Sequence, residues 1–448
     1  MTSERMSAVD SAWLHMDEPD DPADIVTLLT FDEPLSYDAL KKTIEGRLLK
    51  YERFKQRVTE VEGHPTWEED PQFQIERHVM RYEVDAPLTD QCLSEVVADL
   101  ANQRLDPNRP LWAVHLVEGP EGGSAIVARL HHCIADGFAL AHAMINLADR
   151  ADGTQMSDAV QAAEQPEHEP LWQALVHEAN ETMRNPSHAL DLAKQGKGLA
   201  LSLGHLLFVP FDRRTVLKHE LSGRRRMAWS SGLDLEMIKS IAHGRGATVN
   251  DILLGALTGA LRHFLAEAGE PVDELTVRAI VPVNLRPIHR IEEMDDSMGN
   301  RFGLVFLDLP VCEKTTGSRL RSLKEGMDAL KCTPEAFVAF GILNALGHTP
   351  ASVEHIVNEV FGRKASLVVT NVPGPREPLY IDGKRCRDVM FWVPHPAHLG
   401  VGLSILSYAG KVIVGVRVDE GVTKNPARLV ELFEEETCAM VEKANSSY

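Results

Sequence analysis

The sequence lacks several features that would assign a chain quickly to a class of protein. Its 448 residues contain no apolar run of about 20 residues, the length that spans a bilayer. The first residues show no basic stretch followed by an apolar core, the pattern of an export signal. We therefore expect a cytoplasmic protein that is neither exported nor membrane-spanning.

Paired cysteines are missing as well. The six cysteines are scattered along the chain without a C-x-x-C pair, which argues against both a disulfide framework and a zinc cluster. The histidines at positions 395 and 398 have no recognised metal-ligand spacing. We expect reduced thiols and no bound metal.

The chain also has fewer basic residues than acidic ones, 46 against 66. The formal net charge is −20, which disfavours nucleic acid as a partner and requires local positive charge for any ligand that carries phosphates. One basic run stands out, opposed within its window only by Glu220, and it comprises Arg213, Arg214, Lys218 and residues 224–226. Two interpretations stay open, a solvated connector and a contact with phosphate or anionic lipid.

The most informative stretch is 124–147, which predicts a strand, a tight polar corner and a helix. Residues 125–130 are apolar except for Arg129, as expected of a strand covered on both faces. The helix is expected to begin after Asp136 and Gly137, because apolar residues then recur at helical spacing.

Two adjacent histidines, His131 and His132, lie at this corner. Side chains alternate along a strand, so the two imidazoles must point to opposite faces and at most one can serve a given cavity. A neutral imidazole can take a proton from a hydroxyl, thiol or amine that attacks a carbonyl. No Gly-x-Ser-x-Gly elbow accompanies the pair, which favours direct transfer over a covalent acyl-enzyme. The alternative is a pair of core histidines bonded to backbone carbonyls.

The segment HHCIADG, at 131–137, resembles the HHxxxDG signature of the CoA-dependent acyltransferase superfamily. Other motifs resemble those of one family within it, the bacterial wax ester synthase/diacylglycerol acyltransferases. Their order and spacing along the chain are also similar. These motifs are PLW at 110–112, TVND at 248–251, NLRP at 284–287, GNR at 299–301 and TNVPGP at 370–375. The similarity covers nearly the whole chain.

This resemblance implies an α/β, two-domain chloramphenicol-acetyltransferase-like fold with mixed sheets and an active-site tunnel between the domains. The expected reaction moves a fatty acyl group from acyl-CoA to the hydroxyl of diacylglycerol or a long-chain alcohol, with no further cofactor. Lipid substrates also suggest a peripheral position on the inner membrane face or on lipid bodies. The apolar residues 199–211, next to the basic run, are the best candidate for that contact, with a linker helix as the alternative.

The resemblance also implies roles for individual residues. His132 is expected to be the general base, and Asp136 to be a structural residue whose carboxylate pairs with Arg286. Supporting roles are expected for His131, Gly137, Asn250, Arg286 and Thr370. Within that set, Asn250 is an amide donor near the acyl site or a shaping residue, and Thr370 is an oxyanion donor. Seen without the resemblance, Asn250 is an ordinary first-turn helix residue and Thr370 an ordinary strand residue.

The length of the chain favours two domains. We predict a first acyltransferase domain at 1–165, a helical linker at 166–226 and a second acyltransferase domain at 227–448. Within the second, residues 248–265 are almost wholly apolar, which predicts a helix buried on all sides, with Thr248 and Asp251 as a capping box.

Two other functions stay open at this point. One is a condensation-type enzyme that uses carrier-bound acyl groups or amines, and the other is a non-catalytic relative. The acceptor is not fixed either, because the family's usual Met-His pair at the first strand is replaced by Ala23 and Asp24.

Overall fold

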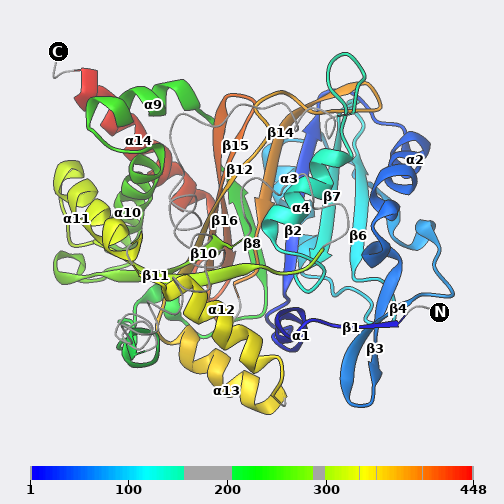
Figure 1. Ribbon diagram of the computed structural model, residues 1–448. Helices are drawn as coiled ribbons and strands as arrows, with labels where there is room; N and C mark the ends of the chain where they lie inside the picture. Colours follow the sequence, from blue (N-terminus) through cyan, green and yellow to red (C-terminus); the bar gives the residue numbers. More distant parts are fainter. Residues whose placement is uncertain are drawn as a thin grey trace.

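The computed structural model describes residues 3–155, 204–285, 298–331, 333–349, 351–395 and 397–445. Two β-sheets stand next to each other, one drawn mainly in blue and cyan and the other mainly in green to red, with helices around them (Figure 1). This is the mixed α/β arrangement that the sequence predicts.

The first sheet has six strands in the order β13-β14-β2-β7-β6-β5. Their bounds are Tyr380–Ile381 (β13), Lys384–Trp392 (β14), Asp24–Phe31 (β2), Ser124–His131 (β7), Trp112–Glu118 (β6) and Val79–Glu83 (β5). Both faces are covered, as predicted for the strand before the two histidines, and all eight residues of β7 are buried. Strands β13 and β14 come from the second half of the chain, so this sheet is not continuous in sequence. The domain limits at 165 and 227 remain predictions.

The helices of the first half cover the two faces of this sheet. They are α1 (Ala8–His15), α2 (Tyr37–Arg47), α3 (Asp90–Ala101) and α4 (Gly137–Asn146). Ile25 and Leu29 of β2 join a core with α2 and α4, whereas Val26 and Leu28 join a core with α3. The alternation of side chains along one strand thus supplies two cores. A small separate sheet contains β1 (Ser3–Arg5), β4 (His64–Glu69) and β3 (Gln56–Val61).

The second sheet has seven strands, six of them in the order β11-β10-β12-β15-β16-β8, with β9 paired to β16. Their bounds are Phe302–Leu309 (β11), Val277–Asn284 (β10), Leu367–Pro373 (β12), Val401–Tyr408 (β15), Lys411–Asp419 (β16), Arg225–Trp229 (β8) and Leu233–Asp234 (β9). Strands β15 and β16 form an antiparallel hairpin, and Ala409 and Gly410 at its turn both have the positive φ that such a tight turn uses.

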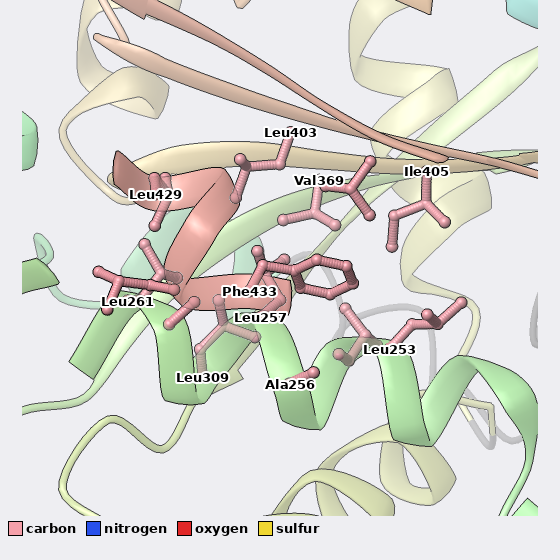
Figure 2. Packing of buried hydrophobic residues seen from close by; sticks show 14 of the residues in the cluster. Leu253, Ala256, Leu257, Leu261, Leu309, Val369, Leu403, Ile405, Leu429 and Phe433 are labelled. Carbon is pink, nitrogen blue, oxygen red and sulfur yellow. The ribbon is translucent and has the colours of Figure 1, made fainter. Parts of the chain in front are cut away.

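The helices of the second half are α9 (Leu235–Gly244), α10 (Val249–Glu267), α11 (Thr316–Lys331), α12 (Glu335–Leu346), α13 (Ala351–Gly362) and α14 (Ala427–Asn445). Figure 2 shows Leu253 and Leu257 of α10 and Phe433 of α14 pointing toward Val369 and Ile405 of the sheet. The predicted buried helix is confirmed, and so is its capping box: the Thr248 backbone N–H donates to the Asp251 carboxylate over 2.8 Å.

Three of the described helices, α1, α9 and α12, were not predicted. The helix α1 is short, and α12 follows closely on α11, so neither has strong periodicity of its own. Most of the predicted linker, residues 156–203, lies outside the described residues. Across the described ranges, no single helix is both long and apolar enough to cross a membrane. One bent pair, Thr316–Leu330 with Glu335–Leu346, meets those criteria of length and composition together.

Candidate active site

The corner that carries the two histidines is tied to its neighbours through the backbone. The His131 N–H donates to the Leu111 carbonyl over 3.0 Å, and the His132 N–H donates to the Ala23 carbonyl over 2.9 Å. Asp136 then ends the corner as the N-cap of α4, where its side chain accepts the Ala139 N–H over 3.0 Å. The position of each imidazole therefore follows from strand pairing on both sides of β7.

The two imidazoles face different cavities, as strand alternation predicts. His132 lines a mainly apolar cavity together with Asp136 and Gly137, and helices α1, α12 and α13 contribute to its wall. His131 lines a second, more polar cavity, with Asp17 and Asp24 in its wall. One histidine of the pair thus faces an apolar cavity, and the other faces a polar one.

The surroundings of His132 are aromatic. The Trp13 ring lies parallel to the imidazole, with centroids 3.8 Å apart and an interplanar angle of 12°, and Phe302 lies 5.6 Å away at a tilt. The His132 Nδ1 is buried and has no hydrogen-bond partner among the described residues. Burial lowers the pKa of His132 to about 4, although the nearby Asp136 acts in the opposite direction. The ring is therefore neutral at pH 7.

The surroundings of His131 are polar. Its Nδ1 accepts the Cys133 backbone N–H over 3.1 Å, and its Nε2 lies 3.7 Å from a carboxylate oxygen of Asp17. The register of β2 and β7 places Asp24 directly opposite His131. These contacts hold the ring within the scaffold of the corner.

A short turn from the second half of the chain, residues 299–301, braces the corner. The Asn300 side-chain amide donates to the His132 carbonyl and to the Asp10 carboxylate, both over 2.8 Å. The Arg301 backbone N–H donates to the Asp136 carboxylate over 3.0 Å. Gly299 has a φ of +125°, which a side chain would strain. Helix α1 thus holds His132 through Asn300, and Asp136 is held by a backbone donor.

Part of the wall of the His132 cavity comes from the second sheet. Thr370 and Asn371 of β12 both line it, so the structure brings Thr370 into the same cavity as His132. Asn250 is not among the lining residues, and its side-chain oxygen instead accepts a hydrogen bond from the Asn371 amide. Asn250 can therefore influence the cavity through Asn371. The predicted pairing of Arg286 with Asp136 cannot be followed, because Arg286 lies outside the described residues.

Three residues of this site escaped prediction. Asp10 and Trp13 lie on α1, and Asn300 was noted only within a motif, without a role. The one local signal for α1 is Ser7, whose hydroxyl accepts the Asp10 N–H over 3.1 Å as an N-cap. No pattern in the sequence indicates that α1 contacts a corner more than a hundred residues away.

The basic run is largely occupied by contacts within the protein. Arg225 is buried and pairs with Asp21 over 2.8 Å, and Arg226 pairs with Glu420 over 2.8 Å. The Lys218 ammonium donates to the Arg363 carbonyl over 2.7 Å. Glu220 is the one acidic residue within the sequence of this run, but in the fold Asp21 and Glu420 also pair with its arginines. Residues 225–226 are not part of a flexible connector, because they belong to β8.

Trp112 of the PLW motif and the histidines at positions 395 and 398 are held by contacts within the protein. Trp112 is buried, its indole N–H donates to the Phe54 carbonyl over 2.8 Å, and its ring stacks on His78, which supports a packing role. His398 lies 3.6 Å from Glu18, and His395 is fully buried. Among the described residues, no three His, Cys, Asp or Glu side chains converge in a way that could hold a metal ion.

Two family models match the chain. The wax ester synthase/diacylglycerol acyltransferase catalytic domain matches residues 6–253, and the C-terminal domain of the same family matches residues 298–440. This chain belongs to that family. Relatives named diacylglycerol O-acyltransferase in Mycobacterium bovis and Mycobacterium tuberculosis are each 28% identical over 420 residues, which cover 90% of this chain and 88% of the relative.

Solved structures of a member of this family and of condensation domains have the same fold. The wax ester synthase/diacylglycerol acyltransferase of Marinobacter aquaeolei superposes with a TM-score of 0.70 at 20% identity, covering 99% of this chain and 100% of that one. The first condensation domain of the CDA synthetase gives 0.61 at 16% identity, with 99% and 96% covered. A starter condensation domain of rhizomide synthetase, a mutant in complex with C8-CoA, gives 0.59 at 14%, with 99% and 95% covered. The predicted family and two-domain fold are confirmed.

Proposed function

We propose that this family member transfers a fatty acyl group from acyl-CoA to the hydroxyl of a lipid, either diacylglycerol or a long-chain alcohol. The observation that carries the proposal is a neutral imidazole, His132, in the wall of a largely apolar cavity. Such a wall suits an acyl chain, and such an imidazole can accept the proton of a hydroxyl. The names of the relatives and the C8-CoA bound to a structural neighbour support the acceptor class and the donor.

In the proposed reaction His132 acts as the general base, through Nε2, because its Nδ1 is buried. The imidazole takes the acceptor's hydroxyl proton as the oxygen forms a bond to the thioester carbonyl carbon. The resulting tetrahedral intermediate breaks its carbon–sulfur bond, and the imidazolium returns the proton to the departing thiolate. No covalent acyl-enzyme is required.

Two groups beside His132 fit the charges that this reaction creates. The Trp13 face lies against the imidazole, so it stabilises the positive charge that forms on the ring during proton transfer. We assign Thr370, which lines the same cavity, as donor to the carbonyl oxygen when it becomes negative. Asp136 has a positioning role, because its carboxylate accepts the backbone N–H groups of Ala139 and Arg301.

The substrates of this proposal are sparingly soluble in water. We infer that the enzyme meets its acceptor at a lipid surface, as a peripheral protein. A condensation-type reaction with an amine acceptor is the second candidate, because the condensation domains share this fold.

Product analysis by mass spectrometry tests the reaction. The full chain is incubated with palmitoyl-CoA and, in parallel, with diacylglycerol, hexadecanol or an amino acid. We expect triacylglycerol or wax ester together with free CoA. An amide product would favour the condensation reaction, and a folded protein that forms no product with any acceptor would overturn the proposal.

A further inference from the structure

Large apolar side chains are exposed in one region of the molecule. The described residues include seven such side chains, and six of them lie on two segments, residues 207–211 and helix α13. Phe208 is 84% exposed, Ile356 61% and Phe211 58%. We call these six the outer apolar face; they are Leu207, Phe208, Phe211, Val353, Ile356 and Val360. A cluster of this kind is uncommon on a protein that meets only water.

The two segments are neighbours in the fold. The Asp212 backbone N–H donates to the Arg363 carbonyl over 3.0 Å, directly after α13. The buried Lys364 ammonium donates to the Leu207 carbonyl over 2.8 Å. These hydrogen bonds fix residues 207–211 beside the C-terminal end of α13, so the two segments that carry the outer apolar face are neighbours.

Both segments have a second side that lines the cavity of His132. On α13, Val357 and Phe361 line the cavity, whereas Ile356 and Val360 are exposed. On the other segment, Leu206 lines the cavity, whereas the adjacent Leu207 is exposed. The outer apolar face and the apolar wall of the candidate active site are therefore two sides of the same thin layer of protein.

Positive charge borders this face, although the chain as a whole has a net charge of −20. Arg213 and Arg214 follow Phe211 directly and are exposed, and Arg363 follows α13 with 59% of its side chain exposed. Glu359 pairs with Arg363 over 2.6 Å. Apolar side chains edged by arginines suit a surface of anionic phospholipid, in which acyl chains lie beneath negative headgroups.

We infer that the outer apolar face docks on an anionic phospholipid surface and brings the cavity of His132 to the lipid. The purpose of this docking depends on the proposed function, but the docking itself does not. It differs from the sequence-based expectation for 199–211, because helix α13 supplies half of the surface and residues 225–226 supply none of it.

Co-sedimentation with vesicles tests the inference. The vesicles contain equal parts of phosphatidylcholine and phosphatidylglycerol, and the variants are Phe208→Ser with Phe211→Ser, and Ile356→Ser. We expect the double variant to bind roughly 10- to 100-fold more weakly, since each aromatic ring that enters the lipid contributes apolar burial. Val61→Ser is the matched control, because Val61 is the exposed apolar residue outside this face, and it should bind as the natural chain does.

A second set of experiments tests the role of the arginines and the effect of docking on activity. Arg213→Ala should weaken binding about fivefold at low salt, and pure phosphatidylcholine vesicles should bind more weakly than the mixture. The Phe208 variants should keep their acyl transfer to a short-chain, water-soluble alcohol and lose transfer to diacylglycerol held in vesicles. His132→Ala should bind vesicles normally, so a failure of the proposed chemistry is distinguishable from a failure of docking.

Two results would overturn the inference. One is unchanged vesicle binding by the folded Phe208 and Ile356 variants. The other is a dimer of the natural chain in sedimentation velocity that Ile356→Ser dissociates, without any vesicle binding, which would make the face a contact between two copies.

Discussion

His131 and His132 are neighbours in the chain but differ in almost every physical respect. His132 lies against Trp13 in the wall of an apolar cavity, and its ring is neutral. His131 accepts a backbone N–H, lies near Asp17 and lines a polar cavity. The difference arises because a strand sends consecutive side chains to opposite faces. The comparison teaches that a tandem histidine motif at a strand end presents one ring to an apolar cavity and the other to a polar one.

The largest expected effect is the difference in kcat between variants of the two histidines. His132→Ala should lower kcat by about 10²- to 10⁴-fold, the usual contribution of a positioned general base. His131→Ala should lower kcat by less than about tenfold and mainly reduce the free energy of unfolding, by roughly 1–3 kcal/mol, because it leaves the Cys133 N–H unpaired. Steady-state kinetics and urea unfolding measure both. Equal losses of kcat in two well-folded variants would contradict the comparison.

The brace behind His132 should have the next largest effect. Asp10→Ala removes the acceptor that holds Asn300, so the His132 backbone shifts and kcat falls by up to about 10²-fold. Asp10→Asn retains an oxygen that accepts the same hydrogen bonds, and it should recover most of the activity. If Asp10→Asn were as impaired as Asp10→Ala, or if KM alone changed, the brace would not position the base.

The aromatic contact is expected to contribute less. Trp13→Leu removes the ring that stabilises the developing imidazolium, and kcat should fall roughly 2- to 30-fold. Trp13→Phe keeps a ring at the same place and should lose less. Both variants should retain their KM for acyl-CoA. A Phe variant no better than the Leu variant would show that stacking plays no part.

The smallest expected effect concerns pH: kcat should not change as the pH passes through about 6.5. Burial lowers the pKa of His132 to about 4, below the value of about 6.5 for a free histidine, so the base stays neutral between pH 5 and 8. The plot of kcat against pH should show no loss near pH 6.5. The unfolded chain takes up a proton on this histidine below pH 6.5 and the folded chain does not until about pH 4, so stability falls as the pH drops through that window. A loss of activity centred near pH 6.5 would place the ring in water.

Much of this organisation is visible in the sequence. The apolar run before His131 predicts β7, the Asp136 and Gly137 pair predicts the start of α4, and the alternation of strand side chains predicts that the two imidazoles separate. These features depend on residues within a few positions of one another, so local sequence determines them. The motifs around the histidines also identify the family.

The tertiary structure alone decided what surrounds His132 and what holds it in place. Asp10, Trp13 and Asn300 meet His132 from distant parts of the chain, and Asp21 and Glu420 neutralise arginines that look free in the sequence. The exposure of Ile356 likewise depends on which side of α13 meets the cavity. The spacing of apolar residues indicates the secondary structure of a single segment. These contacts depend instead on which surfaces the packing of two sheets brings together.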